Sequence, residues 1–109
     1  MNDFNLIIEK LLQFRDERDW EQFHNAKDLA IALNIEAGEL LENFLWKSPE
    51  EVNVDKIKEE LADVFTYAFY LAEKFNLDIT EIVLEKIERN SAKYTIEKSK
   101  GNAKKYTEL

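Results

Sequence analysis

The scarcity of helix-breaking residues is the feature that most limits how this chain can fold. Only two glycines and one proline occur in its 109 residues. Glycine and proline build most tight turns and interrupt helices, so an all-β chain of this size would need many of them. The sequence therefore predicts long helices separated by few breaks, within a single domain that spans residues 1–109.

Apolar residues recur at helical spacing in four segments of the chain. We expect helices from about Asp3 to Arg18, from Ala26 to Phe44–Trp46, from Val54 to Phe75 and from Ile79 to Lys98. No alternating pattern of the kind found in strands competes with these segments. The predicted fold class is all-α, an antiparallel helical bundle of about four helices, with a polar tail at residues 98–109.

The breaks between these segments carry signals that start helices. Asn25 and Asp78 precede the second and fourth segments, and both residue types are favoured N-caps. Ser48, Pro49 and Glu51 form a capping-box pattern with proline at the first helical position. This pattern predicts a short separate turn before the third helix.

The charge and composition exclude several classes of protein. The net charge is −8, whereas a general nucleic-acid surface needs clustered Lys and Arg. There is no cysteine, so disulfides and thiolate metal sites are excluded. No apolar run approaches the roughly 20 residues that span a membrane, and "MNDFNLIIEK" does not resemble a signal peptide. We expect a cytoplasmic protein that binds neither nucleic acid nor membranes.

Two pairs of acidic residues stand out against the apolar faces of the second and third helices. Glu36 falls inside the apolar stripe of the second helix, and Glu39 lies at its edge. Glu60 and Asp63 lie at the edge of the stripe of the third helix. Residues three apart are neighbours on a helix surface, so antiparallel packing through the stripes would bring all four carboxylates to one level. Such oxygen ligands suit Mg²⁺ or Mn²⁺ and a phosphate-bearing substrate.

The acidic pairs are also compatible with a solvated surface or with a different metal centre. Glutamates at this spacing are common on solvated helix faces, where they bind nothing. A carboxylate-bridged di-iron bundle would need Glu-x-x-His motifs, and the only histidine, His24, precedes the second helix. The di-iron alternative is therefore the weaker one.

Further candidates for binding lie outside the acidic pairs. Trp20 and Trp46 occupy breaks between helices, where binding residues are common, although they could equally cover the core. Lys86, Asn90 and Lys93 share one face of the fourth helix, which is typical either of a phosphate site or of a solvated surface.

The apolar arc of the third helix extends past one stripe through Ala62 and Phe69. A helix that is apolar over such a width is buried on two sides. In so small a chain, this width predicts a contact between subunits.

The acidic motifs resemble those of a known family. "EAGE" (36–39) and "ELAD" (60–63) resemble the E-x-x-E and E-x-x-D signature of the MazG-like all-α nucleoside triphosphate pyrophosphohydrolases. The segments "ERDWEQFH", "FLWKS", "EELADVFTY", "KIERNSAKY" and "KKYTEL" follow in order and resemble the dCTP pyrophosphatase branch. These segments extend across nearly the whole chain.

The resemblance implies a function and a set of site residues. It implies Mg²⁺-dependent hydrolysis of a nucleoside triphosphate to the monophosphate and pyrophosphate, by homodimers or homotetramers. The implied metal ligands are Glu36, Glu39, Glu60 and Asp63. The residues implied to bind substrate are Trp20, His24, Trp46 and Tyr67 around the base and sugar, and Lys86, Asn90 and Lys93 near the phosphates or sugar.

We expect one-step hydrolysis, because the chain has no cysteine and no evident serine–histidine arrangement. Glu36 is the candidate that orients or deprotonates the attacking water, with Glu39 as the substitute. The expected substrate is dCTP or a modified dCTP. The alternatives are a broader pyrophosphatase acting on dUTP and other deoxynucleotides, and a non-catalytic helical scaffold or metal-binding protein.

Overall fold

The computed structural model describes residues 3–109, and every regular element in this part of the chain is helical. Four long helices are present: α1 (Asp3–Glu17), α2 (Ala26–Glu42), α3 (Val54–Lys74) and α4 (Ile79–Lys93). The shorter elements are η1 (Glu21–Phe23), η2 (Pro49–Glu51), α5 (Ile96–Ser99) and η3 (Tyr106–Glu108). The predicted all-α class is confirmed. None of the described helices has the length and apolar character needed to cross a membrane.

Side-chain caps are present at the predicted starts of α2 and α4, where they accept hydrogen bonds from free backbone N–H groups. The Asn25 Oδ1 accepts a hydrogen bond from the backbone N–H of Asp28 at 2.9 Å. The Asp78 Oδ1 accepts one from the N–H of Glu81 at 3.0 Å. The first N–H groups of a helix have no partner within it, so these caps fix where α2 and α4 begin.

The predicted turn before the third helix is also present. The backbone N–H and the hydroxyl of Ser48 both donate to the Glu51 carboxylate, at 3.2 and 2.8 Å. Pro49 occupies the first position of the short helix η2, where its missing N–H costs nothing. The capping-box prediction is therefore confirmed.

Replacing Asn25 by Ala should lower the free energy of unfolding by about 1 kcal/mol, because the cap of α2 is lost. Chemical denaturation monitored by circular dichroism measures this change. Asn34→Ala is the matched control, since Asn34 is exposed in the middle of α2 and alanine is the better helix former there. Equal destabilisation by both variants would contradict a capping role for Asn25.

Two helices end earlier than the sequence predicts. The second helix ends at Glu42 rather than at Phe44–Trp46, because the Asn43 side chain donates to the Glu39 carbonyl and the following bonds tighten into turns. The fourth helix ends at Lys93 rather than Lys98. Tyr94 leaves helical geometry there, and Thr95 adopts the extended backbone of an N-cap before α5.

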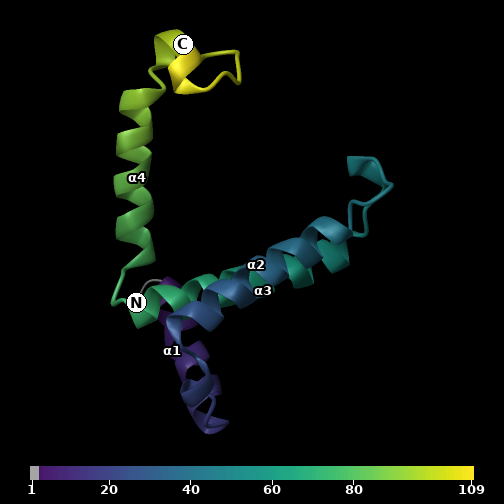
Figure 1. The fold of residues 1–109 in the computed structure, drawn as a ribbon, viewed down its shortest axis with the longest axis vertical. Helices are drawn as coiled ribbons and strands as arrows, with labels where there is room; N and C mark the ends of the chain where they lie inside the picture. Colours follow the sequence, from purple (N-terminus) through teal and green to yellow (C-terminus); the bar gives the residue numbers. More distant parts are fainter. Residues whose placement is uncertain (1–2) are drawn as a thin grey trace. The chain divides into compact units, whose positions relative to one another are not determined.

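The described contacts divide the chain into two units, the first ending at Asn76 and the second running from Leu77 to Leu109. In the first unit, α2 and α3 lie side by side and antiparallel, joined by residues 43–53, and α1 packs against α3 (Figure 1). The buried apolar side chains described here are Leu29 at 2% exposure, Phe69, Tyr70 and Ala72. The α2–α3 pair is therefore the frame on which the acidic motifs are placed.

The apolar stripe predicted for α3 is only partly buried. Leu61 and Phe75 belong to that stripe and are exposed, whereas Phe69 is among the most buried residues. The Phe4 ring of α1 meets the Phe69 ring edge-on with centroids 5.5 Å apart. The burial of Phe69 is therefore explained by α1 of the same chain rather than by a subunit contact, while Ala62 is exposed.

The second unit orders part of the predicted polar tail. Tyr106 of η3 meets the ring of Tyr94 edge-on, with centroids 5.9 Å apart. The Lys93 ammonium lies over the Tyr106 ring, 4.9 Å from its centroid. These contacts hold the segment around Tyr106 beside the end of α4.

Candidate functional site

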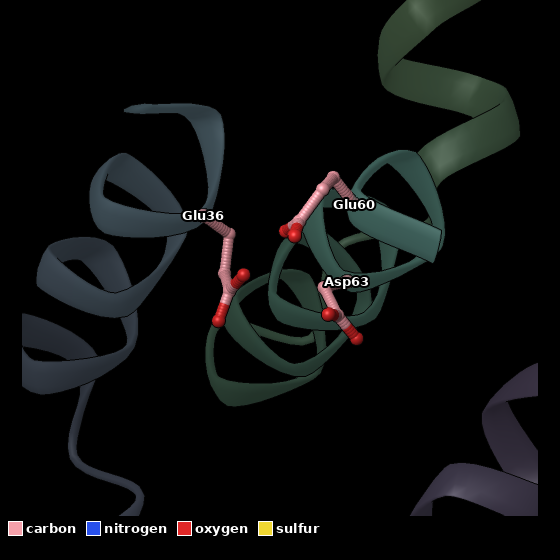
Figure 2. A group of neighbouring side chains, drawn as sticks. All are labelled: Glu36, Glu60 and Asp63. Carbon is pink, nitrogen blue, oxygen red and sulfur yellow. The ribbon is translucent and has the colours of Figure 1, made fainter. Parts of the chain in front are cut away.

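Three acidic side chains from α2 and α3 converge in the first unit. Glu36 points from α2 towards α3, which carries Glu60 and Asp63 (Figure 2). One carboxylate oxygen of each residue lies within 4.8 Å of the others. The predicted meeting of the two acidic pairs is thus present for three of the four residues. We call Glu36, Glu60 and Asp63 the acidic cluster.

The chemistry of the acidic cluster fits a divalent cation. The Oε2 atoms of Glu36 and Glu60 are buried and have no hydrogen-bond partner. Burial raises the pKa of Glu36 to about 7, and the nearby carboxylates of Glu39, Asp63 and Glu60 add to this shift. Burial likewise raises the pKa of Glu60. Among the described residues, none of the recorded ion pairs involves Glu36, Glu60 or Asp63. Hard oxygen ligands held this close together are what Mg²⁺ or Mn²⁺ would neutralise.

Glu39 lies outside the acidic cluster but close to it. Its side chain is exposed, and its charge raises the pKa of both Glu36 and Glu60. The turn of α2 that carries Glu36 therefore also brings Glu39 near α3. Glu39 could join a bound cation after a change of rotamer, which stays a prediction.

A cavity of about 330 Å³ opens beside the acidic cluster. Its lining is mostly aromatic and apolar, and two of the acidic residues form part of it. The lining residues are Leu11, Phe14, Trp20, His24, Glu36, Asp63, Thr66, Tyr67 and Tyr70. We call it the aromatic cavity. It contains three of the predicted substrate-binding residues, Trp20, His24 and Tyr67, next to two of the predicted metal ligands.

His24 contributes a neutral imidazole to the aromatic cavity. Burial lowers its pKa, and the positive charges of Arg15 and Lys74 lower it further. The ring meets Tyr70 edge-on, with centroids 4.7 Å apart, and its buried Nδ1 has no hydrogen-bond partner. A neutral imidazole can both donate and accept hydrogen bonds, which suits the edge of an uncharged ring.

Sequence reasoning missed several residues of the aromatic cavity. Thr66 and Tyr70 lie on α3 at spacings of three and seven from Asp63, so the helical period could have placed them on its face. Phe14 belongs to α1, and its ring meets Trp20 edge-on at 5.7 Å. No local pattern could have placed Phe14 in the same cavity as the α3 residues, because its position depends on how α1 packs.

A larger cavity of about 700 Å³ lies at the joined ends of α2 and α3. It is mainly polar, and it contains two lysines that the sequence did not single out. The lining residues are Glu39, Glu42, Asn43, Lys47, Asn53, Lys56, Glu59 and Glu60. Glu60 of the acidic cluster therefore faces this polar cavity, while Glu36 and Asp63 line the aromatic one.

The structure does not bring Trp46 into either of these cavities. Its side chain is 99% exposed, and its backbone has a φ of 63°, an uncommon conformation for a bulky residue. The base-binding role expected of Trp46 stays a prediction.

Lys86, Asn90 and Lys93 belong to α4 in the second unit. All three are exposed, and their spacing places them on one face of that helix. Their expected role near the phosphates stays a prediction.

Known proteins resemble this chain over most of its length. Residues 31–109 match the MazG-like family. The chain is 40% identical over 105 residues to dCTP pyrophosphatase 1 of Mus musculus and 38% identical to that of Homo sapiens. Each of these matches covers 89% of this chain and 62% of the relative, so the chain spans less than two thirds of these curated proteins.

A solved structure shares the fold. The crystal structure of a pyrophosphatase from Archaeoglobus fulgidus superposes with a TM-score of 0.82 at 33% identity. The superposition covers 87% of this chain and 94% of that one. Because the family match extends over most of the sequence and the fold agrees, this chain belongs to the MazG-like family.

Proposed function

We propose that this protein hydrolyses a deoxynucleoside triphosphate, dCTP or a modified dCTP, to the monophosphate and pyrophosphate. The acidic cluster beside the aromatic cavity carries the proposal, because it places cation ligands next to surfaces that can stack on a base. The likeness to proteins named dCTP pyrophosphatase 1 supports the choice of substrate. The convergence of Glu36, Glu60 and Asp63 beside this cavity argues against a non-catalytic scaffold, which would need neither feature.

Glu36, Glu60 and Asp63 would hold Mg²⁺, or Mn²⁺ in its place, with Glu39 joining them. The unpartnered buried oxygens of Glu36 and Glu60 support this assignment. A bound divalent cation would neutralise the triphosphate oxygens and lower the pKa of a bound water. Glu36 would orient the attacking water and accept its proton, since a carboxylate with a raised pKa is a better base near neutral pH. Glu39, one turn further along α2, is the substitute for this role.

The aromatic cavity would hold the base and sugar. Trp20 and Tyr67 offer ring surfaces, and neutral His24 offers a hydrogen bond to an uncharged base edge. Trp46 would add a further ring on substrate binding. Lys86 and Lys93 would contact the phosphates as point charges, and Asn90 would bond the sugar or a phosphate.

We also propose that the protein works as a homodimer or homotetramer. Leu41 on α2 is 63% exposed and Phe65 on α3 is 54% exposed, which leaves apolar surface on this pair of helices for a second copy. A cytoplasmic location stays an expectation from the sequence.

Incubation of the purified protein with dCTP and Mg²⁺ tests the reaction. One water should be consumed per dCTP, and dCMP and pyrophosphate should appear in equal amounts. Side-by-side rates on dCTP, dUTP, dATP, dGTP and dTTP then measure base preference. Inorganic phosphate as the only phosphorus product besides the nucleotide would overturn the assignment, and equal rates on all five would favour the broader pyrophosphatase.

A further inference from the structure

The loop between α1 and α2 supplies two of the aromatic cavity's residues, Trp20 and His24. Its only regular element is the three-residue helix η1. Such a short element cannot hold two ring side chains in place by itself. Contacts from outside the loop must therefore fix its position against α3. The rings of Trp20 and His24 meet those of Phe14 and Tyr70. The Nζ of Lys74 on α3 lies 3.9 Å from Oε1 of Glu21.

Arg15, near the end of α1, adds the contacts that join the loop to both α1 and α3. Its backbone carbonyl accepts a hydrogen bond from the N–H of Trp20 at 3.0 Å. Its guanidinium contacts Glu21 of η1, with Nη2 3.6 Å from Oε2. It also contacts Glu73 of α3, with Nη1 3.4 Å from Oε2. One residue thus joins α1, the loop and α3.

The burial of Arg15 is unusual. Its residue exposure is 6%, and it is the one buried charged residue among those described. Its Nε donates to Asp16 at 2.8 Å, so each part of the guanidinium faces a carboxylate. Burying a charged group is costly, and buried ion pairs often add little stability while they do define geometry.

We propose that Arg15 is a positioning residue for substrate recognition: it holds the loop so that Trp20 and His24 face the aromatic cavity, without lining that cavity itself. The role rests on the proposed function, because the cavity is taken to receive the base. The planar guanidinium reaches three carboxylates in fixed directions, which the single ammonium of lysine cannot do. Arg15 therefore affects the binding of the base indirectly, by fixing the position of the loop that carries Trp20 and His24.

Steady-state kinetics of Arg15→Met and Arg15→Lys with dCTP test this role. We expect KM to rise about ten-fold for Arg15→Met while kcat changes less than about two-fold, because binding geometry is disturbed and the acidic cluster is not. Arg15→Lys should recover only part of the affinity, and Glu21→Gln should raise KM in the same direction. An unchanged KM in the folded Arg15→Met variant would overturn the proposal.

Ile8→Ala is the matched control. Ile8 lies two turns earlier on α1, beside Phe69, and does not line the aromatic cavity. This variant should be less stable because most of a half-buried apolar side chain is lost, but its KM should equal that of the wild type. A rise in KM equal to that of Arg15→Met would show that general destabilisation explains the effect, and would overturn the positioning role.

Amide hydrogen exchange supplies a readout that does not depend on turnover. The N–H groups of Trp20 and His24, which bond to the carbonyls of Arg15 and Glu21, should exchange faster in Arg15→Met than in Ile8→Ala. Equal exchange in the two variants would overturn the proposal. If the wild-type protein hydrolysed no nucleotide, the proposed function would fail, and the exchange result alone would decide whether Arg15 holds the loop.

Discussion

Replacing Asp63 by Asn or Glu60 by Gln should lower the turnover of dCTP by roughly a thousand-fold, because each change removes a charged ligand from the cation site. The helical circular-dichroism signal should persist, since Asp63 is exposed, Glu60 is only half-buried, and the loss of either charge relieves repulsion within the acidic cluster. Binding of Mg²⁺, or of Mn²⁺ measured by electron paramagnetic resonance, should weaken in parallel. The pairing of these two losses is what identifies the acidic cluster as the cation site.

Asp55→Asn is the control for these variants. Asp55 is an exposed acidic residue in the first turn of the same helix and lines neither cavity. Its replacement should leave turnover and cation binding close to those of the wild type. Normal turnover in both Asp63→Asn and Glu60→Gln would remove the acidic cluster from the mechanism.

Without divalent cations, the protein should lose stability as the pH rises from about 4.5 to about 7. Glu36 has a pKa of about 7 in the folded chain and of 4.5 as the ordinary value, so the folded state holds its proton more tightly. The contribution of protonated Glu36 to the stability of the folded state is complete below pH 4.5, and it is lost as the pH rises past 7. The full shift corresponds to about 3 kcal/mol, and we expect about 1–2 kcal/mol because the side chain is only half-buried and water screens it.

Urea denaturation in the presence of EDTA at pH 5, 6, 7 and 8 measures this loss. Glu36→Gln should flatten the pH dependence and should be the more stable protein at pH 8. Glu42→Gln is the control on the same helix, since Glu42 is exposed and lies outside the acidic cluster. A pH dependence in Glu36→Gln equal to that of the wild type would contradict the protonation of Glu36.

Added Mg²⁺ should reverse the loss at pH 8 in the wild-type protein. A cation that binds only the folded state stabilises it in proportion to the logarithm of its concentration above the dissociation constant. The gain should be absent in Glu36→Gln if that carboxylate is an essential ligand. A gain of the same size in both proteins would place the cation away from Glu36.

The helices were largely predictable from the sequence because their starts are local events. Asn25 and Asp78 cap the helices that follow them through bonds that span only three residues. The ends were less predictable, since no glycine or proline marks the end of α4 at Lys93. There, the break at Tyr94 and Thr95 accompanies the packing of Tyr94 on Tyr106, twelve residues away.

The acidic pairs could likewise be recognised from spacing, because residues three apart share a face of any helix. Their convergence could only be argued from the assumption that α2 and α3 pack antiparallel, and the structure bears this out for Glu36, Glu60 and Asp63. The helical period placed Glu39 at the edge of the apolar stripe, but it could not show that the Glu39 carboxylate would stay outside the acidic cluster. That outcome depends on the rotation of α2 against its neighbour.

The sequence by itself determined the all-α class, the starts of the helices and the two carboxylate pairs, since each depends on residues a few positions apart. The tertiary structure alone decided that α1 covers Phe69, that Phe14 joins the aromatic cavity, and that Arg15 is buried among carboxylates from its own helix, the loop and α3. These contacts join residues up to 65 positions apart, as between Phe4 and Phe69. No periodic pattern encodes them, because they follow from how the packed helices meet.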